Sequence, residues 1–346
     1  MTRILYGFCG VGMGHFVRNK EIISELSKKH EILVVCSGEP YKKLSNEMVN
    51  VYDTKGFELF FKNNKIINLK TLKKNIQKFN QKTFNNLKKI DKIVLKFKPQ
   101  VVISDWETYS SYKARELNLP LISIDNQHYL IYGKYDTPLI ESFQKWKAEI
   151  ILKSLVKEAD VYIIFLYPGC LLQNKKDIYG VNPLIRKELF NINISDNGFF
   201  LVYQSTQDYN AISKILRKID KKFIIYGFNK EKVDGNLIFK RFTDSQKFID
   251  DLSSCSGVIT NGGFTLISEA MFLGKPLFVV PIVNHFEQVL NALYVRKNKL
   301  GIYSEDFNEK KLKRFVNTSF SLKKSKMKSN KDLFKLLDEV IKSFVL

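Results

Sequence analysis

Histidines at the ends of predicted strands are the first candidates for chemistry in this sequence. The chain contains four histidines, and three of them, His15, His128 and His285, follow short apolar segments that are predicted to be strands. His30 precedes such a segment and is expected to lie at the surface. Imidazole titrates close to neutral pH, so it can take or give a proton during catalysis. The distribution favours a functional role for the three histidines that follow strands.

The first of these histidines closes a glycine-rich stretch, Gly10-Val-Gly12-Met-Gly14-His15, which lies between an apolar segment and a helix predicted for residues 17–29. Glycine lets the backbone approach a ligand, and a helix N-terminus attracts negative charge. A dinucleotide fingerprint would need glycine at position 15, and a P-loop would end in Gly-Lys-Ser/Thr. The stretch therefore predicts a strand-to-helix turn that presents an imidazole. A tight turn with an incidental histidine is the alternative.

A second glycine turn, Asn261-Gly262-Gly263-Phe264, lies between a strand predicted to end at Thr260 and a helix predicted to begin near Thr265. Unpaired N–H groups at a helix start, together with the helix dipole, can hold a diphosphate without a metal. Glu269 follows about one helical turn later and could accept hydrogen bonds from ribose hydroxyls. The alternative is that Glu269 lies on a solvated helix face.

A third polar cluster follows the apolar segment 276–282 and contains His285, Glu287 and Gln288. A carboxylate and an amide side by side offer acceptors and donors to vicinal sugar hydroxyls. The alternative is a capped surface helix.

Composition and absent motifs exclude several classes of protein. The chain has 346 residues, of which 45% are apolar and 26% charged, which is typical of globular domains. No apolar stretch reaches the roughly 18 residues of a transmembrane helix, and the N-terminus lacks the apolar core of a secretory signal, so we expect a cytoplasmic protein. The sequence has no zinc-ligand spacing, no Asp-x-Asp and no Gly-x-Ser-x-Gly. It therefore predicts no metal and no cofactor, and it argues against a serine hydrolase.

The spacing of apolar segments predicts the fold class. Strands are predicted at 31–38, 101–105 and 161–167, the last being the final strand of the first half, and the segment 119–128 is predicted to be a strand followed by a loop. The pattern restarts at 199–206. Alternation of strands with helices implies right-handed crossovers and a parallel sheet. We expect an α/β protein with an N-terminal domain at 1–180, a linker at 181–196, a C-terminal domain at 197–330 and a C-terminal helix at 331–346.

The positive charge of the chain is concentrated in one segment. Lys and Arg together number 56 against 35 Asp and Glu, a net charge of +21. The segment Phe61–Lys98 contains 12 lysines and a single acid, Asp91, so it carries about half of the excess. Its spacing predicts helices with one apolar and one basic face. The apolar face could pack on the N-terminal domain, or the helices could bind an anionic membrane surface or acceptor. No aromatic–basic platform accompanies the lysines, so no nucleic-acid partner is predicted.

The segment 261–292, NGGFTLISEAMFLGKPLFVVPIVNHFEQVLNA, resembles the nucleotide-sugar loop of GT-B-fold glycosyltransferases. It is similar to the UDP-glucuronosyl- and plant UDP-glycosyltransferases, and to the enzyme that adds N-acetylglucosamine to the peptidoglycan lipid precursor. The segment GVGMGHFVR similarly resembles the N-terminal loop of that family. The resemblance implies two Rossmann-like, doubly wound parallel-sheet domains facing a central cleft, with the C-terminal helix crossing back to the N-terminal domain.

The resemblance also implies roles for individual residues. His15 matches the family's general base, and Asp105 falls where an aspartate orients that base. The acceptor-binding residues implied are Gly12, Met13 and His128. The donor-binding residues implied are Gly14, Ser205, Thr206, Phe242, Gly262, Gly263, Phe264, Thr265, Ser268, Glu269, His285, Glu287 and Gln288.

The implied reaction is an inverting, metal-independent transfer of a sugar from a nucleotide-diphosphate donor, with UDP favoured, to a hydroxyl of a glycan or lipid-linked acceptor. Cell-envelope glycan synthesis at the inner face of the membrane would suit the Lys-rich segment 61–98. Two departures from the plant pattern stand out: Asn261-Gly-Gly-Phe264 replaces His-Cys-Gly-Trp, and about two extra residues precede Glu287. The alternatives are an enzyme like UDP-N-acetylglucosamine 2-epimerase on the same fold, and a non-catalytic protein that binds anionic polymers.

Overall fold

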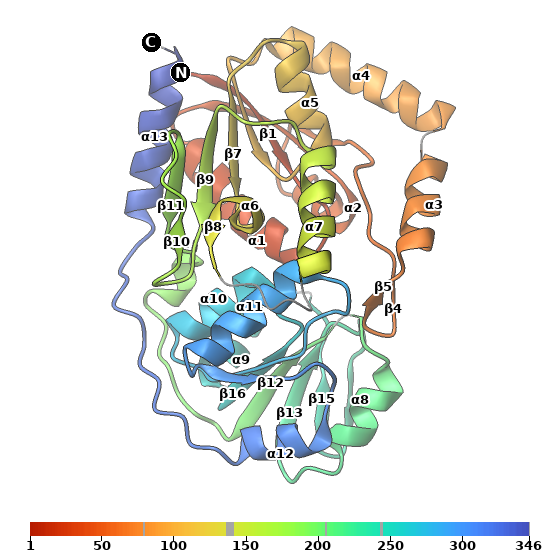
Figure 1. Ribbon diagram of the computed structural model, residues 1–346, viewed down its shortest axis with the longest axis vertical. Coiled ribbons are helices and arrows are strands. Elements are labelled where there is room, and N and C mark those ends of the chain that lie inside the picture. Colours follow the sequence, from red (N-terminus) through yellow and green to blue (C-terminus); the bar gives the residue numbers. More distant parts are fainter. Residues whose placement is uncertain (79, 136–141, 205, 243–244, 346) are drawn as a thin grey trace. The chain divides into compact units, whose positions relative to one another are not determined.

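The computed structural model describes residues 1–78, 80–135, 142–204, 206–242 and 245–345 (Figure 1). The chain forms two compact units. Unit 1 comprises residues 1–60, 68–184 and 330–346, and unit 2 comprises residues 61–67 and 185–329. Residues 61–67 lie inside the range expected for the N-terminal domain, but they group with unit 2.

A seven-stranded sheet forms the centre of unit 1 in the described part of the chain, with the order β11-β9-β7-β6-β1-β2-β3. Neighbouring strands pair in parallel throughout. The strands are β1 (Arg3–Phe8), β2 (Glu31–Cys36), β3 (Val51–Asp53), β6 (Val101–Asp105), β7 (Leu121–Asp125), β9 (Val161–Phe165) and β11 (Ile178–Val181). The central strands are buried along most of their length, which explains their continuous apolar sequences. The prediction that 161–167 is the final strand of this half is wrong, because β11 pairs with β9 beyond it.

The helices of unit 1 lie in the connections between its strands and at the C-terminus of the chain. They are α1 (Met13–Leu26), α2 (Gly38–Leu44), α3 (Asn68–Lys78), α4 (Gln81–Phe97), α5 (Thr108–Glu116), α6 (Tyr129–Tyr132), α7 (Ser142–Leu155) and α13 (Lys331–Val345). A short antiparallel pair, β8 (Gly133–Lys134) with β10 (Leu171–Leu172), lies beside α6. Helix α1 begins four residues before the predicted start, so His15 lies in its first turn.

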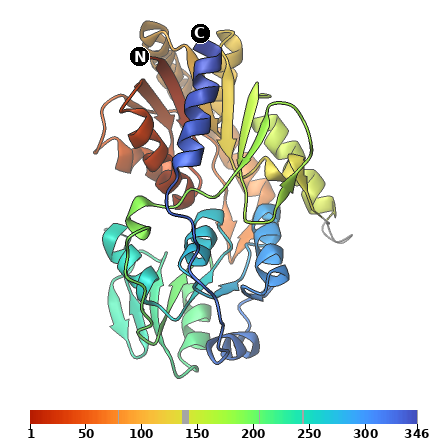
Figure 2. The same ribbon diagram turned by 90° about the vertical axis from the view of Figure 1, so that its left-hand side faces the viewer.

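The C-terminal helix α13 returns to unit 1, as the resemblance implies. It lies alongside the sheet of unit 1, close to the N-terminus of the chain (Figure 2). The apolar spacing seen in the sequence becomes its packed face, with Leu333, Leu337, Val340 and Ile341 buried. Lys29, in the turn after α1, forms an ion pair with Asp338 of α13.

Unit 2 contains a second seven-stranded sheet within the described residues, with the order β14-β15-β13-β12-β16-β17-β18. Its strands are β12 (Phe199–Tyr203), β13 (Lys222–Tyr226), β14 (Lys232–Asp234), β15 (Leu237–Phe239), β16 (Gly257–Thr260), β17 (Leu277–Val279) and β18 (Gly301–Tyr303). Only the edge pair β14–β15 is antiparallel among the described pairings of this sheet. The helices are α8 (Tyr209–Leu216), α9 (Ser245–Ser254), α10 (Phe264–Phe272), α11 (Phe286–Lys297) and α12 (Glu309–Val316), with a short 3₁₀ helix η2 (Lys187–Leu189).

The Lys-rich segment differs from its prediction in two ways. Its first residues form a hairpin, β4 (Phe61–Lys62) with β5 (Lys65–Ile66), and helices α3 and α4 follow. The apolar face of α3 is not packed: Leu69 is 83% exposed, and Leu72 and Ile76 are exposed as well. The interpretation that this face packs on the domain is therefore wrong for α3. It is confirmed for α4 in part, where Ile90 and Val94 are buried in the core of unit 1.

Candidate functional site

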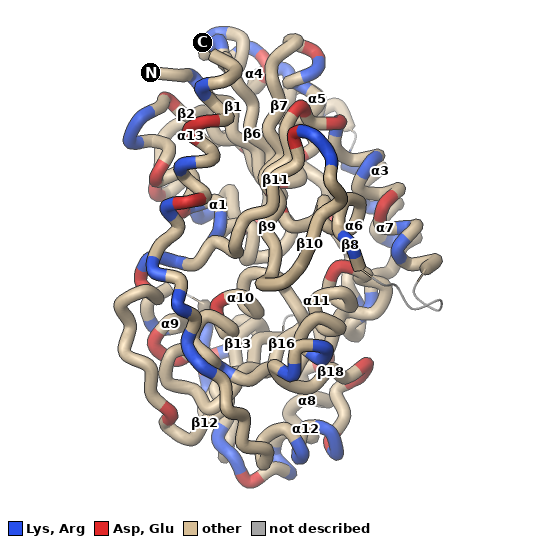
Figure 3. Tube along the Cα trace, turned by 60° about the vertical axis from the view of Figure 1, so that its left-hand side comes forward, with Lys and Arg blue, Asp and Glu red and all other residues tan. Residues whose placement is uncertain are grey.

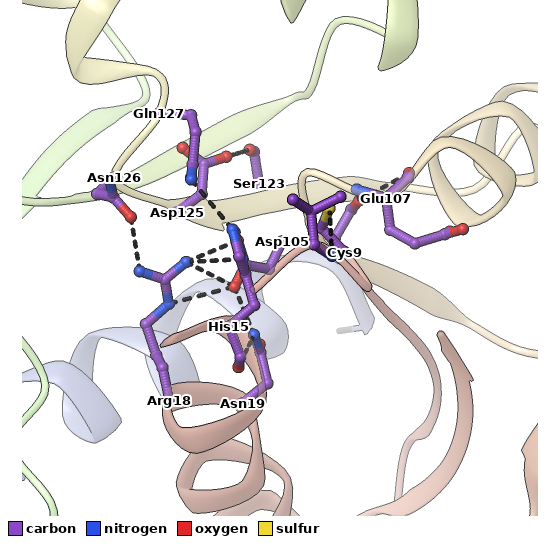
Figure 4. A network of polar contacts seen from close by, with 12 residues as sticks. Cys9, His15, Arg18, Asn19, Asp105, Glu107, Ser123, Asp125, Asn126 and Gln127 are labelled. Atoms are coloured by element: carbon purple, nitrogen blue, oxygen red, sulfur yellow. Dashed lines mark hydrogen bonds and ion pairs between the residues drawn. The ribbon is translucent and has the colours of Figure 1, made fainter. Parts of the chain in front are cut away.

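Three loops at the carboxyl edge of the unit 1 sheet bring together the polar side chains that the sequence singled out. In parallel sheets this edge is where ligands bind, because the loops that follow the strands meet there. His15 lies in the first turn of α1, which follows β1, Asp105 ends β6, and residues 126–128 follow β7 (Figure 4).

The expected pair of His15 and Asp105 is formed. Nδ1 of His15 lies 3.1 Å from Oδ1 of Asp105. The carboxylate is completely buried, whereas the imidazole keeps 11% of its surface exposed. Burial alone would raise the pKa of Asp105, but the charges of Arg18 and His15 outweigh it and hold that pKa well below its usual range. An ionised Asp105 accepts a hydrogen bond from the N–H at Nδ1, which leaves the lone pair of the neutral imidazole on Nε2.

Arg18 is a buried member of this site that sequence reasoning missed. Its Nη2 donates to Oδ1 and Oδ2 of Asp105 at 2.8 and 2.7 Å, and its Nη1 donates to Oδ1 of Asn126 at 2.7 Å. Nη2 also lies 3.2 Å from Nδ1 of His15. The guanidinium therefore neutralises Asp105 and ties α1 to the loop after β7. The spacing of three residues between His15 and Arg18, which places both on one helix face, was the available signal.

Asn19 and Tyr6 complete the surroundings of Asp105. The amide of Asn19 donates to Oδ2 of Asp105 and to the carbonyl oxygen of His15, the latter at 2.8 Å. The Tyr6 hydroxyl donates to the amide oxygen of Asn19. Burial, reinforced by the charge of Asp105, raises the pKa of Tyr6, so the phenol stays protonated and remains a donor. These contacts fix Asp105 from several sides, so His15 faces a carboxylate that cannot rotate away.

The loop after β7 holds a second histidine–aspartate pair. Nδ1 of His128 lies 2.7 Å from Oδ2 of Asp125, and the Ser123 hydroxyl donates to the same oxygen at 2.8 Å. The ring of His128 is buried and packs against Tyr132 and Tyr162. His128 thus holds the loop in place, and its expected contact with an acceptor stays a prediction.

Two residues of this region face the imidazole of His15 directly. Nε2 of Gln127 lies 3.2 Å from Nε2 of His15. The indole of Trp106 stacks near the imidazole, with 6.5 Å between ring centroids. Sequence reasoning missed both residues. Trp106 directly follows the end of β6, and Gln127 lies two residues after the end of β7.

The glycine turn before α1 has the backbone that only glycine adopts readily. Gly12 precedes the helix with a φ of +83°. Met13 and Gly14 then form the first two positions of α1. The three residues thus lie at the helix start beside His15, and their implied substrate contacts stay predictions.

In unit 2, the carboxyl ends of β12, β16 and β17 gather the residues expected to bind the donor. Gly262 has a φ of +100°, and a Cβ there would lie 3.1 Å from the carbonyl oxygen of Gln288. Gly263 precedes α10, and Phe264 begins it. The Asn291 amide donates to the Gly262 carbonyl at 2.9 Å, and the backbone N–H of Ile282 donates to Oε1 of Gln288 at 3.0 Å. The glycine turn and the start of α11 therefore form one packed group.

The remaining donor-site candidates occupy varied surroundings. Thr265 is half-buried in the first turn of α10, and the Ser268 hydroxyl donates to the Phe264 carbonyl at 2.8 Å within the same helix. His285 and Glu287 lie half-buried at the start of α11. Phe242 packs against Tyr226 and Phe248. Ser205 lies outside the described residues, and Thr206 donates to Oδ1 of Asn64 at 2.8 Å.

Glu269 is buried, so the alternative of a solvated helix face is wrong. Nε and Nη2 of Arg186 donate to its two carboxylate oxygens, each at 2.6 Å. Nη1 of Arg186 also donates to the Ser245 hydroxyl at 3.2 Å. Arg186 and Asn64 are the two residues of this group that sequence reasoning missed, because both lie far from their partners along the chain.

No group of three His, Cys, Asp or Glu side chains that could hold a metal ion occurs in the described ranges of the chain. The polar groups that converge on His15 are one carboxylate, one guanidinium and amides, which suit proton transfer rather than metal ligation.

Two curated relatives share part of this sequence. One is the UDP-N-acetylglucosamine–N-acetylmuramyl-(pentapeptide) pyrophosphoryl-undecaprenol N-acetylglucosamine transferase 3 of Bacillus cereus, which is 29% identical over 154 residues. The corresponding transferase 1 of Bacillus thuringiensis is 26% identical over 153 residues. Each match covers 38% of this chain and 43% of the relative, so the likeness spans less than half of the length of these proteins.

Solved structures show the same fold at low sequence identity. The calicheamicin glycosyltransferase CalG4 superposes with a TM-score of 0.59 at 14% identity, covering 92% of this chain and 91% of that one. A Phytolacca americana protein, solved with UDP-2-fluoroglucose and pterostilbene, superposes with a TM-score of 0.63 at 14% identity over 100% of both chains. The two sheets and these likenesses confirm the expected GT-B fold. The sequence pattern of the family described as glycosyl transferase family 1 matches residues 2–319, and the chain therefore belongs to that family.

Proposed function

We propose that this protein transfers a sugar from a nucleotide-diphosphate donor to a hydroxyl group, with His15 as the general base. The observation that carries the proposal is the contact between Nδ1 of His15 and the buried, ionised Asp105 at 3.1 Å. A carboxylate in this position fixes the imidazole tautomer and stabilises the imidazolium that forms when Nε2 takes a proton. The family to which the chain belongs supplies the reaction class.

The reaction is a single displacement at the anomeric carbon. Nε2 of His15 takes the proton of the acceptor hydroxyl while that oxygen forms a bond to the anomeric carbon. The bond between this carbon and the diphosphate oxygen breaks, and the nucleoside diphosphate leaves with the electron pair. One displacement inverts the anomeric configuration. The Gln127 amide, 3.2 Å from Nε2, gives way to the acceptor hydroxyl in this scheme.

The start of α10 is proposed to hold the leaving diphosphate without a metal. The helix dipole places partial positive charge at this helix start, which favours an anionic group there. Gly263, which precedes the helix, has nothing within 4 Å of the position that a Cβ would take, so a ligand can approach its backbone. These features favour stabilisation of the negative charge that develops on the leaving oxygen.

The curated relatives supply the substrate classes. Their names describe transfer of N-acetylglucosamine from a UDP-linked donor to a lipid-linked muramyl acceptor. We propose a UDP-sugar as the donor and a glycan or lipid-linked hydroxyl as the acceptor for this chain, in cell-envelope glycan synthesis. Cytoplasmic placement at the inner face of the membrane belongs to the same proposal.

Exposed apolar side chains among lysines support binding to an anionic membrane surface. Leu69, Leu72 and Ile76 are exposed and follow one another at helical spacing on α3, and Lys70, Lys73 and Lys74 lie among them in the sequence. Figure 3 marks the lysine and arginine positions along the chain, including those of α3. Helix α7 exposes a second apolar group, Phe143, Trp146, Ile150 and Ile151. Such a mixture suits adsorption at a headgroup interface. No described helix is long and apolar enough to cross a bilayer.

The test is product analysis with a panel of UDP-, dTDP- and GDP-linked sugars and a lipid-linked acceptor. Expected results are transfer from a UDP-sugar in the presence of EDTA, an inverted anomeric configuration by NMR, and loss of transfer in His15→Ala. Retention of configuration would contradict the single displacement. Acceptor-independent epimerisation of UDP-N-acetylglucosamine would instead favour the epimerase alternative.

A further inference from the structure

The β4–β5 hairpin belongs to unit 2, although the residues before and after it belong to unit 1. Its strands contain two residues each, with Phe61 paired to Ile66 and Lys62 paired to Lys65. An isolated hairpin of this size is not stable in water. The hairpin is therefore held by what it packs against, and Ile66 and Asn64 are its buried side chains.

The tip of the hairpin is built from two asparagines in left-handed conformation. Asn63 has a φ of +47° and Asn64 a φ of +56°. A two-residue turn with both central residues at positive φ matches the twist of the strands, and asparagine tolerates this backbone better than other side chains except glycine. Asn63 is exposed, whereas Asn64 is only 5% exposed.

Asn64 contacts the loops that follow three neighbouring strands of unit 2. Its Oδ1 accepts hydrogen bonds from the Thr206 hydroxyl after β12, at 2.8 Å, and from the Asn261 amide after β16, at 3.1 Å. Its Nδ2 donates to the Pro281 carbonyl after β17 at 2.9 Å. One side chain therefore links three loops at the carboxyl edge of the sheet.

The backbone of the hairpin strengthens the same attachment. The N–H of Asn64 donates to the Thr206 carbonyl at 2.8 Å, and the Asn64 carbonyl accepts from the N–H of Val283 at 2.8 Å. The N–H of Ile66 donates to the Val283 carbonyl at 3.1 Å. These bonds pair the hairpin with the loop after β17 in a strand-like way. The hairpin is therefore part of the carboxyl edge of the unit 2 sheet.

We propose that Asn64 is a positioning residue for the diphosphate part of the donor site. This inference rests on the proposed function, which places the diphosphate at the start of α10, next to the Asn261–Gly263 turn. The resemblance adds Thr206 to the donor-binding residues. Asn64 fixes the hydroxyl of Thr206 and the amide of Asn261 relative to each other, and it ties both to the loop that leads into α11. A segment encoded among the N-terminal domain residues thus completes the donor-binding edge of the C-terminal unit.

The lysines of the hairpin add charge at the same place. Lys62 and Lys65 flank the tip and are exposed. Two cations beside an edge that receives a diphosphate raise the local concentration of anionic ligands. This contribution does not depend on the Asn64 side chain, so it remains in the variants described next.

The test compares Asn64→Gly with Asn63→Gly. Both keep the left-handed turn, since glycine adopts it freely, but only the first removes the side chain that links the loops. Binding of UDP and of uridine is measured by calorimetry, and donor KM and kcat by a transfer assay. We expect Asn64→Gly to weaken UDP binding about tenfold or more. This is the factor expected when Thr206 or Asn261, no longer held in place, loses a hydrogen bond to the charged diphosphate. Uridine binding should stay within about threefold on the same scale, because positioning acts on the diphosphate contacts. The transfer rate should fall with UDP binding, because the same contacts stabilise the leaving diphosphate. Asn63→Gly should match the unaltered protein.

Several outcomes overturn the inference. UDP binding that is unchanged in Asn64→Gly would show that the side chain positions nothing, and tighter binding would show that the hairpin competes with the donor. Equal weakening of UDP and uridine would indicate a general loss of structure. If Asn64→Gly does not fold, Asn64→Asp replaces it: the carboxylate still accepts from Thr206 and Asn261 but adds negative charge, so UDP binding should weaken and uridine binding should not. Failure of the unaltered protein to bind UDP or transfer sugar would instead overturn the proposed function.

Discussion

Arg186 donates one hydrogen bond to each carboxylate oxygen of Glu269 inside unit 2, both at 2.6 Å. Both side chains are almost completely buried. Arg186 lies just before η2 and Glu269 lies on α10, so the pair fastens the start of unit 2 to the helix whose N-terminus is proposed to hold the diphosphate. An ionised carboxylate has about four lone-pair positions, and the guanidinium uses two of them. The others can accept from ribose hydroxyls, so the ion pair is compatible with the implied role of Glu269.

The free energy of unfolding should fall much more when the Arg186–Glu269 ion pair loses one partner than when it loses both. Arg186→Met leaves a buried carboxylate without compensation, and we expect the free energy of unfolding to fall by about 3–5 kcal/mol. The double variant Arg186→Met with Glu269→Leu removes both charges and should recover most of that loss. Urea denaturation at pH 7 measures the difference. A double variant that is less stable than Arg186→Met would contradict this account of the pair.

Glu269 should also make the protein distinguish nucleotides that differ at the ribose 2′-hydroxyl. If Glu269 accepts hydrogen bonds from ribose, the protein should bind UDP more tightly than 2′-deoxy-UDP, by about five- to tenfold for one hydrogen bond. The folded double variant, Arg186→Met with Glu269→Leu, should bind both nucleotides equally. Calorimetry with the two nucleotides decides the point. A preference for UDP that persists in the double variant would place the ribose elsewhere.

His15 should affect the chemical step and leave donor binding unchanged. We expect His15→Ala to lower kcat about 10²- to 10⁴-fold, the usual contribution of a general base. UDP affinity should stay as it is, because the residues proposed to hold the diphosphate and the ribose belong to unit 2. Single-turnover transfer and nucleotide titration separate the two quantities. His30→Ala, which removes a histidine at the far end of the α1 segment, is the matched control and should retain activity.

Asp105 should make the stability of the protein depend on pH in the acidic range. Burial would raise its pKa, but Arg18 and His15 lower it in the folded state. The unfolded chain, with a carboxyl pKa of about 3.9, therefore binds the proton first as pH falls. The stabilisation is complete above that pH and is lost as pH falls toward the folded-state pKa.

The measurement for Asp105 is the free energy of unfolding of Asp105→Asn relative to the unaltered protein between pH 7 and pH 3. The deficit should be large at pH 7, on the order of 3–5 kcal/mol, because Arg18 loses its counter-ion in a buried site. It should shrink below about pH 4. Asp220→Asn, at an exposed position, provides the control and should show no such trend. A deficit that is the same at pH 3 and pH 7 would rule out this linkage.

Local patterns predicted the strands and glycine turns, because apolar segments and glycines act over a few residues. The pairing of His15 with Asp105 followed from the resemblance and is formed in the structure. The partners of these residues could not be predicted in the same way. Arg18 and Asp105 are 87 positions apart, and Asn64 bonds to residues 142 and 197 positions further along. Such contacts depend on which loops the folded sheet brings together.

The β4–β5 hairpin is where the helical spacing of apolar residues predicted the wrong secondary structure. Ile66 lies in the segment Phe61–Lys98, whose spacing predicts helices, but it belongs to β5. The signal available in the sequence was Lys62-Asn-Asn-Lys65, because a pair of asparagines between short extended residues is typical of a tight hairpin turn. The lysines around it obscured this signal, since their number favoured one continuous basic helical region.

The exposed apolar residues of α3 and α7 should control adsorption to anionic vesicles. We expect the unaltered protein to float with phosphatidylcholine vesicles that contain phosphatidylglycerol, less so at high salt, and not with phosphatidylcholine alone. Leu72→Glu combined with Trp146→Glu should weaken flotation at least about tenfold, because each side chain loses roughly 1.5–3 kcal/mol of apolar burial and gains repulsion from the lipid. Val233→Glu is the matched control, since Val233 is also exposed but lies on β14 of unit 2. Equal loss of flotation in the control and the double variant would show that charge alone drives adsorption, and flotation that survives the double variant would exclude α3 and α7 as the membrane-binding surface.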